Sequence, residues 1–195
     1  YTLEDDEVIE AAKLAHQKQF GSLVLQSGER SDAWFVKKIS HFLKEIHKAT
    51  KNELHITLSM GEQSEETFKL WRESGAHRYL VRIETSNKNL YQKIHPNDNL
   101  HSFQKRIEAL ELLRKIGYQV GTGVMIGLPF QTLEDLANDL LFIKKLDVDM
   151  VGMGPYIEHE ATPLFKFRDR LLPKTERFEL SMKMVGLLRT MMPTI

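Results

Sequence analysis

Three ionisable side chains interrupt patterns that are otherwise apolar. Residues 79–85 alternate like a β-strand, so Arg82 and Glu84 lie on one face. Arg106 lies within the apolar stripe of a predicted helix that begins at Phe103. Charged groups on a buried face are costly unless they are paired or used for binding. Two interpretations follow: an internal ion pair with Arg106 at the edge of the stripe, or a binding site that uses all three groups.

A zwitterionic ligand suits this set of charges. A guanidinium group binds a carboxylate through two parallel hydrogen bonds, and a carboxylate accepts hydrogen bonds from an amine or a ribose hydroxyl. Small and polar residues also share one face of other predicted strands, namely Thr57 with Ser59, Gly121 and Gly123 with Met125, and Met150 with Gly152 and Gly154. We expect these faces to line a cavity, and close strand packing is the alternative explanation for the glycines.

The elements that position these residues alternate between strands and helices. Strands are predicted at 22–26, 54–60, 79–85, 120–129 and 149–155. Helices are predicted at 2–20, 31–49, 64–74, 88–94, 103–116, from 132 onward, and at 178–191. Strict alternation predicts a parallel sheet with helices outside it, either doubly wound or part of a (β/α) barrel. Polar and small inner faces, in place of bulky branched residues, favour a barrel wall around a cavity.

The composition argues against several classes of protein. The chain has 195 residues, 42% of them hydrophobic, with a formal net charge of zero, so nothing indicates a nucleic-acid or anionic membrane surface. It has no apolar run that could span a bilayer and no signal-peptide pattern. It has no cysteine, which excludes thiolate nucleophiles and thiolate metal ligands in this chain. The spacing of His95, His101 and His159 fits no standard ligand set, so no metal site is predicted here.

Several motifs resemble the radical S-adenosylmethionine (SAM) superfamily. They are GE at 61–62, RIETSN at 82–87, GVMIGLPFQT at 123–132 and DMVGMGPYIEHEATPL at 149–164. Within that superfamily they are most similar to the biotin-synthase-like branch, and there to the maturases that help to build the di-iron cofactor of iron-only hydrogenase. The resemblance runs from Thr2 to Ile195, and its most specific part is 81–164.

The resemblance implies a fold and a set of site residues. The fold is a single, incomplete TIM-type (β/α) barrel domain over residues 1–195, with about five parallel strands, equivalent to barrel strands 2–6, and outer helices. The residues implied to bind SAM are Ser27, Gly28, Glu29, Glu84, Arg106 and Met125. Those implied to line the substrate cavity are Thr57, Ser59, Arg82 and Met150. Arg106 would pair with the SAM carboxylate, and the catalytic residue is left unassigned.

The resemblance also implies an activity and its cofactors. Members cleave SAM reductively to a 5′-deoxyadenosyl radical, here during assembly of the di-iron cofactor. They hold a 4Fe-4S cluster with a CxxxCxxC loop, so the cluster ligands are expected upstream of this cysteine-free chain, which should be inactive by itself. The expected substrate is a small molecule or small metal complex, in the cytoplasm. Other hydrogenase maturation proteins are the expected partners, with no nucleic acid or membrane.

Two alternatives stay open at this point. The first is a methylornithine synthase-like or other biotin-synthase-like enzyme, which shares much of the motif pattern. The second, from another class, is a cysteine-free binding or scaffold protein on a degenerate barrel. Phe130 also departs from the family, which commonly has glycine at that position, and the departure bears on the local turn.

Overall fold

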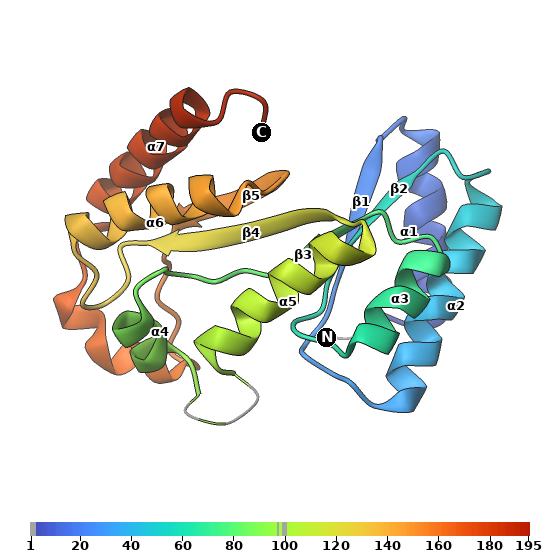
Figure 1. Ribbon diagram of the computed structural model, residues 1–195, viewed down its shortest axis with the longest axis horizontal. Helices are drawn as coiled ribbons and strands as arrows, with labels where there is room; N and C mark the ends of the chain where they lie inside the picture. Colours follow the sequence, from blue (N-terminus) through green and yellow to red (C-terminus); the bar gives the residue numbers. More distant parts are fainter. Residues whose placement is uncertain (1–2, 97, 99–100) are drawn as a thin grey trace. The chain divides into compact units, whose positions relative to one another are not determined.

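The computed structural model describes residues 3–96, 98 and 101–195. The chain forms two compact units (Figure 1). The first contains the described residues up to Val81 together with Ala109–Val120. The second contains Arg82–Glu108 and Gly121–Ile195. Strands and helices alternate along the chain, as the sequence pattern predicts.

Five strands form one sheet whose order follows the chain, β1-β2-β3-β4-β5. They are β1 (Ser22–Gln26), β2 (His55–Ser59), β3 (Arg78–Leu80), β4 (Gln119–Ile126) and β5 (Met150–Pro155). Pairing is parallel, with Ser22 opposite His55, Thr57 opposite Arg78 and Gly121 opposite Met150. Parallel neighbours need a crossover connection, and the helices between the strands supply it.

Several helices begin next to a capping side chain. The helices are α1 (Asp5–Gln17), α2 (Ala33–Ala49), α3 (Glu65–Glu73), α4 (Lys88–Ile94), α5 (Phe103–Ile116), α6 (Leu133–Leu146) and α7 (Lys174–Met191). Asp32 accepts a hydrogen bond from the backbone N–H of Phe35 at 3.0 Å, and Thr132 forms a capping box with Asp135. These contacts confirm the predicted starts of α2 and α6.

Four elements differ clearly from the prediction. The first helix begins at Asp5, and residue 2, where it was expected to begin, lies outside the described residues. A 3₁₀ helix, η1 (Pro163–Arg170), occupies part of the expected loop, and α7 begins at Lys174 instead of 178. The strand predicted over 79–85 is shortened to β3. None of the helices in the described ranges is long and apolar enough to span a membrane.

Aromatic side chains fill the core of the first unit. Phe68, Trp71 and Tyr79 are fully buried and contact one another through their rings. Trp71 donates its indole N–H to the carbonyl of Val36, and Tyr118 donates its hydroxyl to the carbonyl of Phe68 at 2.7 Å. The polar groups of these two rings are therefore satisfied inside the core.

The second unit has a smaller apolar core and a buried arginine. Helix α7 lies beside both α6 and β5 (Figure 1). Arg177 on α7 is 2% exposed and donates to the carbonyls of Leu172 and Tyr156. Its guanidinium also pairs with Glu158 at 2.8 Å. These bonds anchor the segment that follows β5 to α7.

Candidate functional site

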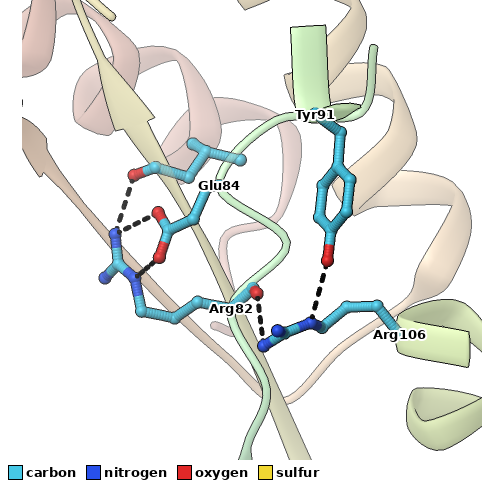
Figure 2. Close-up of polar contacts among 5 residues, drawn as sticks. Arg82, Glu84, Tyr91 and Arg106 are labelled. Carbon is cyan, nitrogen blue, oxygen red and sulfur yellow. Dashed lines mark hydrogen bonds and ion pairs between the residues drawn. The ribbon is translucent and has the colours of Figure 1, made fainter. Parts of the chain in front are cut away.

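Arg82 and Glu84 form an ion pair just beyond β3. Arg82 Nε lies 2.8 Å from Glu84 Oε1, and Arg82 Nη2 lies 3.1 Å from Oε2 (Figure 2). Nη2 also donates to the carbonyl of Val124 at 3.1 Å. Both side chains are half-buried, and their contact corresponds to the internal ion pair of the first interpretation. A bidentate pair of this kind fixes the geometry of both groups.

The backbone turns sharply at Glu84, four residues after Leu80, the last residue of β3. The N–H groups of Ile83 and Glu84 both donate to the carbonyl of Gly123, at 3.0 and 2.9 Å. Thr85 N–H then donates to the carbonyl of Ile83 at 2.7 Å, which makes Glu84 the central residue of a three-residue turn. Glu84 has φ of 60°, in the left-handed region. For a residue other than glycine this conformation costs about 1–3 kcal/mol and persists only when its surroundings hold it.

Glycines on β4 and β5 make room for the guanidinium of Arg82. A Cβ atom at Gly123 would lie 2.3 Å from the carbonyl oxygen of Gly152 and 3.1 Å from Arg82 Cζ. One at Gly152 would lie 3.0 Å from Arg82 Nη1, whereas one at Gly154 would meet nothing within 4 Å. Close packing therefore accounts for Gly123 and Gly152, and open space lies beside Gly154.

Arg106 on α5 is buried, with 6% of its surface exposed. Its Nε donates to the hydroxyl of Tyr91 at 3.3 Å and its Nη1 to the carbonyl of Arg82 at 3.4 Å (Figure 2). The interpretation of an arginine at an exposed edge is therefore wrong. Both bonds are longer than the ~2.8 Å that charged donors usually reach. The guanidinium of Arg106 is buried beside the backbone of Arg82.

Two carboxylates on α6 hold the segment after Glu84. Asp139 Oδ1 accepts hydrogen bonds from the N–H and the hydroxyl of Ser86, each at 2.6 Å. Asp135 Oδ1 accepts from Asn87 Nδ2 at 2.7 Å. Burial raises the pKa of Asp139 to about 6, although its hydrogen bonds from Ser86 act in the opposite direction. The sequence analysis missed both carboxylates; the available signal was two acidic residues four apart on the apolar face of a helix.

The residues predicted to hold the methionyl amino group follow β1 in the first unit. Ser27 is half-buried, and its hydroxyl donates to the carbonyl of Gly28 at 2.8 Å. Gly28 and Glu29 are exposed. The side chain of Glu29 passes close to Gly61, where its Cγ would lie 2.4 Å from an added Cβ. The GE motif at 61–62 thus contacts the turn after β1.

The two predicted cavity residues of the first unit lie on β2. Thr57 is 3% exposed in the middle of the strand, and Ser59 is half-buried at its carboxyl end. The carbonyl of Ser59 accepts the N–H of Ser27 at 3.3 Å. The structure therefore brings Ser59 beside the turn after β1, within the same unit.

In the second unit, Met125 and Met150 lie at different ends of their strands. Met125 is half-buried near the carboxyl end of β4, and its N–H donates to the carbonyl of Glu84 at 3.0 Å. Met150 begins β5 opposite Gly121, whereas Met125 lies opposite Gly154. The structure thus groups Met125 with Arg82 and Glu84 and places Met150 at the far end of β5.

Phe130 lies in a turn with a left-handed backbone conformation. Its φ is 70°, and Gln131 N–H donates to the carbonyl of Leu128 at 3.1 Å. The ring of Phe130 contacts that of Phe167 on η1, with centroids 4.9 Å apart. Aromatic packing accompanies a backbone conformation that glycine adopts more readily.

Three histidines meet in the first unit. The ring of His77 lies 5.5 Å from that of His47 and 4.8 Å from that of His55. Burial lowers the pKa of His77, and the neighbouring imidazoles lower it further. Across the described residues, no group of three or more His, Asp or Glu side chains could hold a metal ion.

The sequence profile of the radical SAM superfamily matches residues 1–143. The chain belongs to the radical SAM superfamily. Among curated relatives, it is 43% identical over 99% of its length to the [FeFe] hydrogenase maturase subunit HydE of Thermotoga maritima. It is 28% identical, again over 99%, to the 3-methylornithine synthase of Methanosarcina acetivorans. It spans 52% of each of these proteins, about half their length.

Solved structures confirm the fold class for this radical SAM chain. The crystal structure of methylornithine synthase (PylB) matches all of the chain and 54% of its own, with a TM-score of 0.84 and 26% identity. The crystal structure of HydG, a maturase of the [FeFe]-hydrogenase, matches all of the chain and 44% of its own, with a TM-score of 0.79. Its identity of 18% supports the fold alone. The predicted fold, a partial (β/α) barrel of five parallel strands with helices, is correct.

Proposed function

We propose that this chain is the central part of a radical SAM enzyme that acts in assembly of the di-iron cofactor of iron-only hydrogenase. Identity of 43% to HydE over 99% of the chain carries this proposal. The RIETSN, GVMIGLPFQT and DMVGMGPYIEHEATPL motifs lie inside that alignment. We also propose that the two units belong to one (β/α) barrel domain, because all five strands pair in chain order.

The residues of the second unit fit one end of SAM. A methionyl group carries a carboxylate and an amine, which need a guanidinium and an acceptor oxygen. Arg106 supplies a buried guanidinium, and Glu84 supplies a carboxylate whose orientation Arg82 fixes. In this proposal Arg106 binds the methionyl carboxylate, Glu84 accepts from a SAM donor, and Met125 lies along the nucleoside.

The remaining predicted contacts complete the proposal. Ser27, Gly28 and Glu29 receive the methionyl amine. Thr57, Ser59, Arg82 and Met150 line the cavity for a small molecule or small metal complex. Of these, Met150 has the weakest support. It is the first residue of β5, whereas (β/α) barrels place their sites at the carboxyl ends of the strands.

An iron–sulfur cluster does not fit the residues present here. Family membership implies a 4Fe-4S cluster as well as SAM, and such clusters need thiolate ligands. This chain has no cysteine, so its own side chains cannot supply them. The chain's contribution to catalysis is therefore to bind and orient SAM and substrate, and 5′-deoxyadenosine should be undetectable when this chain alone is incubated with SAM, iron, sulfide and dithionite.

The partners and location follow from the same proposal. We propose a cytoplasmic enzyme with a small substrate, and other hydrogenase maturation proteins as its partners. No nucleic acid or membrane partner is proposed.

A methylornithine synthase-like activity is the second candidate. The structural similarity to PylB, with a TM-score of 0.84, favours it. Methylornithine formed when the complete protein is incubated with SAM and candidate amino acids would support this candidate. Restored hydrogenase maturation in a strain that lacks its HydE would support the first. A cysteine-free scaffold protein would give neither result and no SAM binding.

Arg106 provides the direct test of the proposed SAM site. Replacing it with alanine should weaken SAM binding to the complete protein about 10- to 150-fold, the loss of about 1.5–3 kcal/mol expected for a charged hydrogen bond. Arg106→Lys should also lose affinity, because a point charge cannot form the bidentate contact. Arg114→Ala, at an exposed position of the same helix, is the matched control. Calorimetric titrations that give one affinity for all four proteins, with folding verified by thermal melts, would remove Arg106 from the site.

A further inference from the structure

Asp139 is a buried carboxylate to which the proposed function gives no role. It lies in the middle of α6 with none of its surface exposed. Both donors of Ser86 use its Oδ1, and its Oδ2 is buried without a hydrogen-bond partner. Burying a carboxylate with one oxygen unsatisfied is costly, and a neutral acceptor would make the same bonds at a smaller cost. Such a group invites an explanation beyond the packing of α6.

What Asp139 holds is the backbone that follows Glu84. Ser86 is two residues beyond Glu84, and the hydroxyl of Thr85 also reaches Asp139 Oδ1, at 3.4 Å. On the other side of Glu84, the N–H groups of Ile83 and Glu84 are fixed on the carbonyl of Gly123. Hydrogen bonds therefore fix the backbone on both sides of Glu84: β4 holds the residues before the turn, and α6 holds those after it. Over-determination of this kind is what a strained backbone needs in order to persist.

The first turn of α6 is linked to Arg106 through α4. Asp135 Oδ1 binds the side-chain amide of Asn87, and Asn87 Oδ1 caps α4 by accepting from the N–H of Leu90 at 3.2 Å. Helix α4 carries Tyr91, whose hydroxyl accepts from Arg106 Nε. One helix that contributes no predicted ligand contact thus supports both the carboxylate and the guanidinium of the candidate site.

We propose that Asp139 is a positioning residue that holds Glu84 in its left-handed conformation, so that the Glu84 carboxylate is oriented for SAM before SAM binds. The claim that Asp139 orients Glu84 for SAM rests on the proposed function. The claim that Asp139 holds the turn is independent of it. Asp139 acts through Ser86 and Thr85 and does not itself touch the ligand. Because the acceptor oxygen is what matters, an asparagine should substitute for it and an alanine should not.

The hold on the turn is measured without any ligand, by amide hydrogen exchange. In Asp139→Ala, the Ser86 amide loses its acceptor and should exchange at least ten times faster than in the wild type. In Asp139→Asn, which keeps Oδ1, its exchange should stay within threefold of the wild type. Leu140→Ala, a buried neighbour on the same helix, is the control for general loosening of α6 and should leave Ser86 protected relative to the other amides of the unit.

The effect on the site is measured by titrating SAM calorimetrically into the complete protein and the same three variants. Asp139→Ala should weaken binding at least tenfold, Asp139→Asn at most threefold, and Leu140→Ala at most twofold. This pattern distinguishes positioning from stability, because alanine at either position destabilises α6 but only one of the two releases the turn.

Each other result has a definite meaning. Unchanged Ser86 exchange in Asp139→Ala would overturn the hold on the turn. Faster exchange with unaltered SAM affinity would overturn positioning of the ligand site, and so would equal losses in Asp139→Ala and Leu140→Ala. If Asp139→Asn lowers SAM affinity as much as Asp139→Ala, the charge of Asp139 is what matters, and the proposed role of its acceptor oxygen is wrong. If the wild type itself binds no SAM, the proposed function fails while the exchange data still decide the hold on the turn.

Discussion

Glu29 and Glu84 both follow strands and are both predicted to contact SAM, yet their surroundings differ. Glu84 occupies a strained turn, pairs with Arg82, and has neighbours fixed by β4 and α6. Glu29 is exposed in the turn after β1, where its side chain passes over Gly61. A side chain already held in place loses less conformational freedom on binding. We therefore expect the Glu84 region to be formed in advance and the Glu29 region to adapt to its ligand.

The largest expected effect concerns the Glu84 region, where stability should depend on pH through Asp139. Its pKa is raised by burial to about 6 in the folded protein, from a model-compound value of 3.8. The folded state thus binds the proton more tightly, so this group's contribution to stability is fully present below about pH 3.8 and is lost as pH rises through 6. Asp139→Asn removes this dependence. As pH rises from 4 to 7, the free energy of unfolding of the variant should increase by up to about 3 kcal/mol relative to that of the wild type.

This difference is best measured by hydrogen exchange of α6, because it reports on the second unit. Both tryptophans, Trp34 and Trp71, lie in the first unit, so their fluorescence serves as the internal control. A stability difference between variant and wild type that is the same at pH 4 and pH 7 would show that Asp139 is solvated in solution.

The next effect concerns a pair of glycines. Gly123→Ala places a Cβ against the backbone oxygen of Gly152 and against Arg82, and should cost about 2–3 kcal/mol of stability. Gly28→Ala meets nothing within 4 Å and should change stability by less than about 0.5 kcal/mol. Urea unfolding of both variants tests the contrast. Similar losses at the two positions would mean that the turn after β1 is as tightly built as the one after β3.

The smallest expected effect is at Gly61, beneath Glu29. Its φ is 69°, so alanine there should cost about 1 kcal/mol from the left-handed backbone. The added methyl group would also displace the flexible Glu29 side chain instead of backbone. Tryptophan fluorescence during denaturation measures the stability of this unit. A loss as large as that of Gly123→Ala would show that Glu29 cannot move aside, which would contradict an adaptable turn.

Periodicity was a good guide to the fold because each strand and helix of this chain has a clear repeat. Strand β1, helix α4 and helix α5 occupy the residues predicted for them, and Asp32, Ser64 and Thr132 cap helices as expected. The family resemblance supplied the barrel, which the alternation alone left open beside a doubly wound sheet. Fold class follows from such local signals because they agree with one another.

The local geometry of the candidate site was less predictable. Alternation over 79–85 placed Arg82 and Glu84 on one face, but it could not show the turn at Glu84, because that turn depends on a carbonyl of β4. It also could not show that Gly123 and Gly152 accommodate the Arg82 side chain. Asp139 was missed for the same reason: its partner, Ser86, is 53 residues away in the sequence. Contacts of this range are set by packing and not by local pattern.

The strand order also bears on how the chain is made. Every strand pairs with the one synthesised just before it, so no strand of this sheet has to wait for a distant part of the chain to emerge from the ribosome. Nearby contacts close short loops first, at a modest loss of chain entropy. We expect β1 and β2, with the helix between them, to dock while later residues are still being translated, and nascent chains arrested beyond α3 should already protect the amides of β2 from exchange.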